Sequence, residues 1–136
     1  MYQYSKSSLK KLESTHPDLQ HLFKQVIKVI DCTIIYGLRT LEQQKDLYAQ
    51  GRTRPGRIVT NLDGIIKRSK HQDGLAVDVV PYPIDWENRE RFVYFAGVVK
   101  GIAGTMNIKI RWGGDWDGDN ELRDQSWMDL PHFELI

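Results

Sequence analysis

Apolar residues recur every three or four positions in the stretch HPDLQHLFKQVIKVID, residues 16–31. This spacing places them on one side of an α-helix, and Pro17 suits its first turn, where the missing N–H needs no partner. A second helix is predicted in RTLEQQKDLYAQG, residues 39–51. Thr40 and Gln43 form a capping-box pattern at its start, and Gly51 stands where a helix commonly ends.

A third helical stripe runs from Trp86 to about Met106. Its apolar positions again follow helical spacing, so we expect one longer helix with a buried face. The aromatic residues Trp86, Phe92 and Phe95 are interpreted as core residues of this helix.

Short β-branched or alternating segments predict four strands, at CTIIYG (32–37), GLAVDVV (74–80), IKIRW (108–112) and HFELI (132–136). Alternate side chains of a strand point to opposite faces. Asp78 therefore lies on the face away from Val77 and Val79, and His132 and Glu134 point away from Phe133 and Leu135.

Residues 51–70 show no sustained periodicity and contain three glycines and a proline, which predicts a long loop at the rim of a site. Residues 113–131 form a second polar loop. With no repeat and no linker, the pattern indicates one compact α+β domain over residues 1–136, with a small, mainly antiparallel sheet packed against helices.

Charge and composition narrow the function. The net charge is +1, from 19 basic and 18 acidic residues, which argues against nucleic acid or an anionic membrane as partner. No stretch approaches the roughly 18 apolar residues of a membrane helix, and no secretory signal is visible. We therefore expect a soluble product made in the cytoplasm. Cys32, the only cysteine, excludes a disulfide framework and suits a small core position.

A catalytic zinc ion takes three protein ligands and keeps one position open. His71 and Asp78 are two candidate ligands, brought together by a turn at Gly74, and His132 is the third. Asp129 is a candidate base for a nearby metal, and Arg39 a candidate cation for an oxyanion or a carboxylate. From spacing alone, other interpretations remain open. His71 and Asp78 can be ordinary polar residues at a strand edge, Asp129 can end a turn, and Arg39 can be an exposed surface residue.

The loop DWDGDNELRDQS resembles a calcium loop at Asp115, Asp117 and Asp119. Its glycine is Gly118, at the fourth position instead of the sixth, and Ser126 occupies the place of the bidentate glutamate. An EF-hand is therefore excluded, whereas binding of some second cation by this acidic loop stays open.

Six segments together resemble the zinc peptidases of bacterial cell walls. They are YGLRT with EQQKDLYAQGRTRPG, TNLDG, SKHQDGLAVDVVP, RWGGDW and DLPHFEL, and they span about residues 36–135. That group includes D-Ala-D-Ala carboxypeptidases and dipeptidases and the L-alanyl-D-glutamate endopeptidases that phages use as endolysins. An aspartate three residues before the last histidine is similar to the phage-type endopeptidases.

The resemblance implies Zn²⁺ held by His71, Asp78 and His132 on the sheet face. It further implies Asp129 as catalytic base, Arg39 as the cation that stabilises the oxyanion, and Ser69 near the substrate.

The predicted function is hydrolysis of the L-alanyl-D-glutamate bond of peptidoglycan stem peptides, leading to bacterial cell-wall degradation. We expect a monomer that acts on the wall after release from the host cytoplasm, with a separate holin for export. One alternative is a D-Ala-D-Ala carboxypeptidase or dipeptidase. The other, from a different class, is a non-catalytic zinc-stabilised wall-binding module.

Overall fold

A four-stranded antiparallel sheet in the order β1-β2-β4-β3 forms the centre of the computed structural model, which describes residues 1–136. Its strands are β1 (Cys32–Tyr36), β2 (Ala76–Pro81), β3 (Ile110–Trp112) and β4 (His132–Leu135). The predicted α+β class and antiparallel sheet are confirmed.

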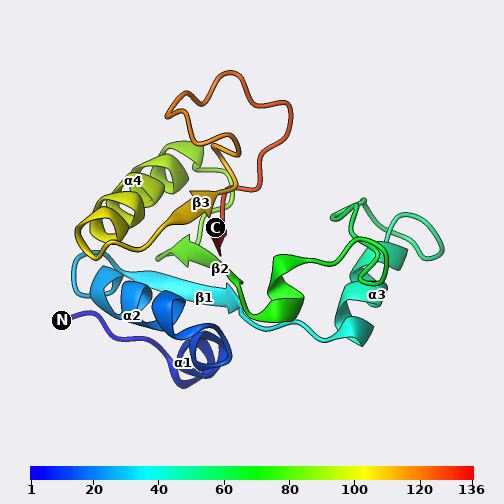
Figure 1. Ribbon diagram of the computed structural model, residues 1–136, viewed down its shortest axis with the longest axis horizontal. Helices are drawn as coiled ribbons and strands as arrows, with labels where there is room; N and C mark the ends of the chain where they lie inside the picture. The colour runs from blue at the N-terminus through cyan, green and yellow to red at the C-terminus, as the bar shows by residue number, and fades with distance from the viewer.

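Three helices and one face of this sheet share a single core (Figure 1). These helices are α1 (Lys6–Glu13), α2 (Pro17–Val26) and α4 (Arg89–Thr105). The Phe133 ring meets Phe23 and Phe95 edge-on, at centroid distances of 5.6 and 6.0 Å. Phe133, Val77 and Val79 are fully buried in this core, as the predicted strand faces require. Cys32 is buried there too.

The remaining helix, α3 (Leu41–Ala49), lies apart from the sheet with the long loop that follows it (Figure 1). We call residues 40–69 the lobe. The predicted capping box of Thr40 and Gln43 is present, and Gly51 has a φ of 81° just past the helix end. The chain returns to the sheet through a short 3-10 helix, η1 (Lys70–Asp73), which ends at Gly74 with a φ of 71°.

Two details of the predicted elements differ from the structure. Helix α4 begins at Arg89, where the Asn88 side chain caps it, so Trp86 precedes the helix. Trp86 is 58% exposed, and its interpretation as a core residue was wrong, whereas Phe92 and Phe95 are buried as predicted. Helix α1 has no counterpart among the predicted elements, because only Ser8 and Leu12 of its eight residues are buried.

No helix of the chain combines the length and the apolar character needed to span a bilayer.

Candidate metal centre and active site

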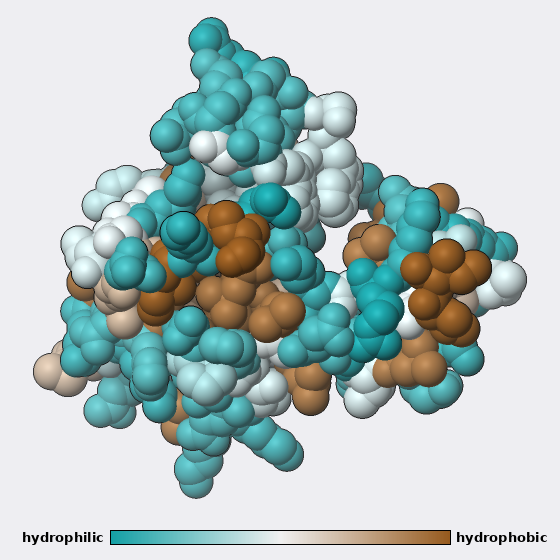
Figure 2. All heavy atoms as spheres, viewed as in Figure 1, coloured by the Kyte–Doolittle hydropathy of each residue, from teal (hydrophilic) through white to brown (hydrophobic).

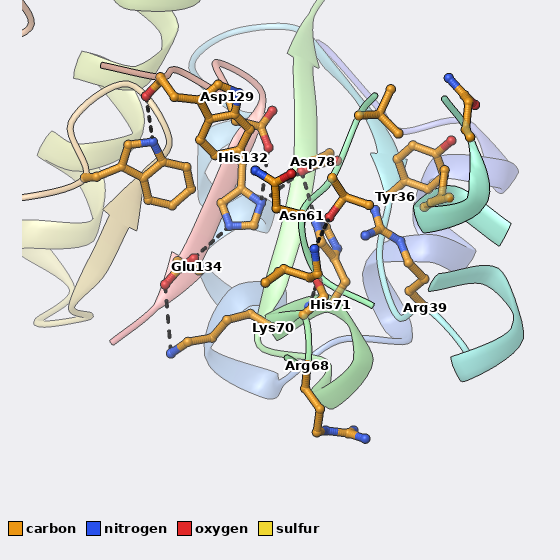
Figure 3. Close-up of a pocket in the computed structure, with 18 of the residues that line it drawn as sticks. Tyr36, Arg39, Asn61, Arg68, Lys70, His71, Asp78, Asp129, His132 and Glu134 are labelled. Carbon is orange, nitrogen blue, oxygen red and sulfur yellow. Dashed lines mark hydrogen bonds and ion pairs between the residues drawn. The ribbon is translucent and has the colours of Figure 1, made fainter. Parts of the chain in front are cut away.

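A cavity of about 610 Å³ opens between the lobe and the sheet face that points away from the core. Figure 2 shows the surface hollowed at this place. Its walls come from the end of β1 with Arg39, the lobe with η1, the strands β2 and β4, Trp86 before α4, and the polar loop 113–131. All six site residues predicted from sequence line it: Arg39, Ser69, His71, Asp78, Asp129 and His132. The fold therefore brings them to one place (Figure 3).

Three of these residues form a tight group on the sheet face. Asp78 and His132 are direct cross-strand partners in the antiparallel pairing of β2 and β4. The Oδ1 atom of Asp78 lies 3.3 Å from Nδ1 of His132 and 3.2 Å from Nε2 of His71. One ligand atom from each residue falls within 4.8 Å of the others, a separation that one metal ion can bridge.

Hydrogen bonds fix which nitrogen of each histidine faces this group. His71 Nδ1 donates to the carbonyl oxygen of Gly37 at 3.0 Å, which turns Nε2 toward Asp78 as the candidate ligand atom. His132 Nε2 donates to the carboxylate of Glu134 at 2.8 Å, which leaves Nδ1. Metal-binding histidines characteristically donate their other N–H in this way. The donor set therefore suits a metal ion before any ion is bound.

The charges of the group depend on each other. Burial alone would raise the pKa of Asp78, but hydrogen bonds from His132 and His71 hold it well below its usual range. Burial would lower the pKa of His132, but hydrogen bonds to Asp78 and Glu134 outweigh it and raise the pKa to about 9. In the metal-free protein, His132 thus carries a proton that a bound cation would replace.

Asp129 lies beside this group without belonging to it. Its Oδ2 atom is 3.9 Å from Nδ1 of His132. The backbone of Asp129 donates to Gly113 at 2.7 Å, and a Cβ at Gly113 would collide with the Asp129 carbonyl group. Burial, together with the negative charge of Asp78, raises the pKa of Asp129 to about 6. Such a carboxylate is ionised at neutral pH yet can hold a proton during a reaction.

Arg39 approaches the cavity from the opposite side (Figure 3). Its backbone N–H donates to the carbonyl of His71 at 2.9 Å, which ties it to the metal-ligand candidate. Its side chain donates from Nη1 to Gln44 at 2.8 Å and lies over the Tyr36 ring. The buried Nε–H has no partner in the structure, which is uncommon for a buried donor.

Gln44 was not among the residues predicted from sequence. It is fully buried, although it belongs to a helix with few apolar residues. Its amide donates to the carbonyl of Leu62 at 2.7 Å while its oxygen accepts from Arg39. Gln44 therefore joins Arg39 to the lobe.

Ser69 lines the cavity and is 4% exposed. Its hydroxyl accepts the backbone N–H of His71 at 3.2 Å and caps η1. The structure thus gives Ser69 a local role in holding the turn that carries His71.

In the polar loop, Asp115, Asp117 and Asp119 also bring one carboxylate oxygen each within 4.8 Å of the others. Asp115 is buried, and Lys100 lies 3.5 Å from its Oδ2 atom. A cation of the chain itself therefore offsets part of this negative charge.

Taken together, the two histidines and the aspartate on an antiparallel sheet, with a second carboxylate beside them, are the arrangement that metal-dependent hydrolases use.

Comparison with known proteins identifies the family. The model of the family "Phage L-alanyl-D-glutamate peptidase" matches residues 1–136, and the chain belongs to this family. The L-alanyl-D-glutamate peptidase of Escherichia phage T5 is 29% identical, over 99% of this chain and 98% of the relative. The Bacillus subtilis endopeptidase CwlK is 36% identical, over 80% of this chain and 63% of its own length.

A solved structure supports the same grouping. The L-Ala D-Glu endopeptidase ChiX of Serratia marcescens superimposes with a TM-score of 0.72 at 26% identity. The match covers 99% of this chain and 91% of ChiX. The resemblance to wall peptidases found in the sequence is thereby confirmed.

Proposed function

We propose that this protein hydrolyses the amide bond between L-Ala and D-Glu in the stem peptides of bacterial peptidoglycan. The relatives named for L-alanyl-D-glutamate cleavage support the bond, and CwlK, which is named a peptidoglycan endopeptidase, supports the substrate. The single observation that carries the chemistry is the Asp129 carboxylate beside the group of His71, Asp78 and His132. A separate carboxylate next to a metal site is what metal-assisted hydrolysis requires of its base.

The ion that fits this donor set is zinc, held by His71 Nε2, Asp78 Oδ1 and His132 Nδ1. Two imidazole nitrogens and one carboxylate suit Zn²⁺ better than Mg²⁺ or Ca²⁺, which prefer oxygen ligands. When bound, zinc would supply a Lewis acid that polarises the scissile carbonyl and eases ionisation of water.

Asp129 acts as the base in this proposal. It accepts the proton of the attacking water and later delivers it to the amine of D-Glu as that group leaves. Its burial supports both roles, because in the metal-free site it raises the pKa of the carboxyl to about 6 and so favours a group that can take up a proton.

Arg39 stabilises the negative charge that develops on the carbonyl oxygen. Its place in the cavity wall, across from Asp129, supports this role. A preorganised donor of this kind contributes most in a water-poor cavity. Ser69 lies near the bound peptide in the proposal, and its place in the cavity wall is compatible with that.

Product analysis tests the bond. Digestion of purified peptidoglycan should release fragments with a new N-terminal D-Glu, detected by mass spectrometry. Free D-Ala would instead assign the protein to the D-Ala-D-Ala carboxypeptidases or dipeptidases. Binding to the wall without any cleavage would support a non-catalytic module.

We also propose that the protein acts as a monomer on the wall and reaches it after release from the host cytoplasm through a separate holin. The cavity is complete within one chain, which supports the monomer. Size-exclusion chromatography with light scattering tests it.

Replacing Glu134 by alanine should lower zinc affinity by about 10–100-fold, because the partner that orients His132 is lost. Glu134→Gln, which keeps an acceptor, should lose less. Competition with a chromogenic chelator measures the affinity. Glu121→Ala removes a carboxylate that contacts Arg123 and not the metal group, and serves as the matched control. Equal zinc affinity in Glu134→Ala and the parent would contradict the role of Glu134.

Replacing Gln44 by leucine should lower kcat about tenfold through loss of the hold on Arg39. In an Arg39→Ala background, Gln44→Leu should leave kcat almost unchanged, because the arginine that Gln44 positions is already absent. Gln43→Leu breaks the capping box on the same helix without touching Arg39, and controls for lobe stability. Equal losses in both backgrounds would show that Gln44 is only structural.

A further inference from the structure

Two tryptophans of the cavity have no part in the chemistry proposed above. Trp86 and Trp127 both line the cavity, and each is 58% exposed. Arg89, three residues after Trp86, donates to the sulfur of Met128, the residue after Trp127, at 3.3 Å. The two indoles therefore belong to adjoining segments of one wall. Exposed aromatic residues gathered in a cavity are typical of a binding surface.

Each indole is supported on one side by another ring. Trp86 stacks on buried Phe92 at a centroid distance of 5.7 Å, and Trp127 stacks on Trp116 at 5.5 Å with an angle of 7° between the planes. Trp116 also donates from Nε1 to the carbonyl of Trp127 at 3.0 Å. Support of this kind fixes the rings before a ligand arrives, so binding costs little side-chain entropy.

The aromatic wall begins directly at the proposed metal group. The Trp116 ring lies 5.5 Å from the His132 ring, centroid to centroid. Arg39, which precedes the lobe, and Arg68, which belongs to it, lie on the other side of the cavity, whereas Lys70 of η1 reaches across to Glu134 at 3.9 Å. The cavity thus has a cationic side, which fits the carboxylates of a stem peptide, and an aromatic side, which fits a neutral ligand with C–H faces.

The substrate of the proposed reaction has such a neutral part close to the scissile bond. In peptidoglycan the stem peptide is joined through L-Ala to the lactyl group of N-acetylmuramic acid. Only L-Ala separates the scissile bond from that linkage, and one residue spans at most about 3.6 Å. With the lactyl group as one further short spacer, the sugar lies within reach of the walls of this cavity of about 610 Å³.

We propose that Trp86 and Trp127 form a saccharide subsite, which binds the N-acetylmuramic acid ring of a substrate still attached to its glycan. The pyranose C–H face packs on an indole face through dispersion and the negative charge of the ring face. This inference rests on the proposed function and adds that the protein distinguishes glycan-linked stem peptides from free ones.

The test compares two soluble substrates of the same peptide sequence, one linked to N-acetylmuramic acid and one N-acetylated without sugar. The parent protein should show the higher kcat/KM for the sugar-linked substrate. Trp127→Ala and Trp86→Ala should each lower the ratio of the two kcat/KM values about tenfold. Trp127→Phe, which keeps a ring, should retain most of the ratio. Tyr94→Ala removes an exposed aromatic of α4 outside the cavity and is the matched control.

A ratio that stays at the parent value in both alanine variants would overturn the subsite. Failure of the parent to cleave either substrate would contradict the proposed function instead. The subsite is then tested by binding of the two peptides to the Asp129→Ala variant, measured as quenching of tryptophan fluorescence. Tighter binding of the sugar-linked peptide than of the sugar-free one would support the subsite, and equal binding would overturn it.

Discussion

Replacing Asp129 by alanine is expected to lower kcat by about 10²–10⁴-fold while the protein keeps its zinc. The reason is the position of Asp129, whose carboxylate lies 3.9 Å from His132 and outside the group of three converging ligand atoms. Loss of the carboxylate removes the proposed proton acceptor and leaves the proposed metal ligands in place. Turnover of a sugar-free stem peptide and zinc content by atomic emission measure the two effects separately.

Two further variants make this result specific. Asp129→Asn keeps the shape of the side chain and should be as inactive as the alanine variant. Asp124→Ala removes an exposed carboxylate of the same loop whose hydrogen bond is to its neighbour Gln125, and should behave as the parent. Full activity of Asp129→Ala would refute its assignment as the base, and loss of zinc would assign it to the ligands.

The sequence predicts the faces of the strands better than their pairing. Alternation places Asp78 and His132 on the face opposite Val77, Val79 and Phe133, and both faces are as predicted. The pairing that makes these two residues direct neighbours across β2 and β4 depends on contacts 54 residues apart. No local pattern carries that information, because register is set by how the whole sheet is covered.

Trp86 shows that helical spacing alone does not determine where a helix begins. Its position fits the stripe that continues through Phe92, so the pattern extends the helix by one turn too many. The structure begins α4 only after the Asn88 cap, and Trp86 stacks against Phe92 from outside the helix. A terminal aromatic can thus follow the periodicity and still be exposed.

Residues that support the site are harder to predict than residues that form it. Glu134 was placed by alternation on the same face as His132, but nothing in the sequence indicated its hydrogen bond to the imidazole. Gln44 resembles any polar residue of an exposed helix. Its burial arises because the segment around Leu62 folds over α3, in a part of the chain with no regular pattern.

Removing the metal with a chelator is expected to stop hydrolysis completely and to leave the fold intact. The core that holds the helices lies on the other face of the sheet. In the metal-free site, His132 also contacts the carboxylates of both Asp78 and Glu134, so the charges of these three residues remain paired. Zinc at 100–1,000 times its dissociation constant adds about 3–4 kcal/mol to the free energy of unfolding. We expect the chelated protein to melt roughly 10 °C lower, with an unchanged circular dichroism spectrum at 25 °C.

Adding back different ions shows which group of residues is responsible. Zinc should restore activity and Tm together, whereas Mg²⁺ should restore neither, because two imidazole nitrogens are poor ligands for a hard cation. Recovery with Ca²⁺ alone would direct attention to Asp115, Asp117 and Asp119 instead. If the chelator unfolds the protein and the zinc-loaded form leaves peptidoglycan intact, the metal serves folding only and the catalytic proposal fails. If the fold is retained while activity is lost and regained with zinc, the ion is required for turnover, because the sheet is then stable without the metal.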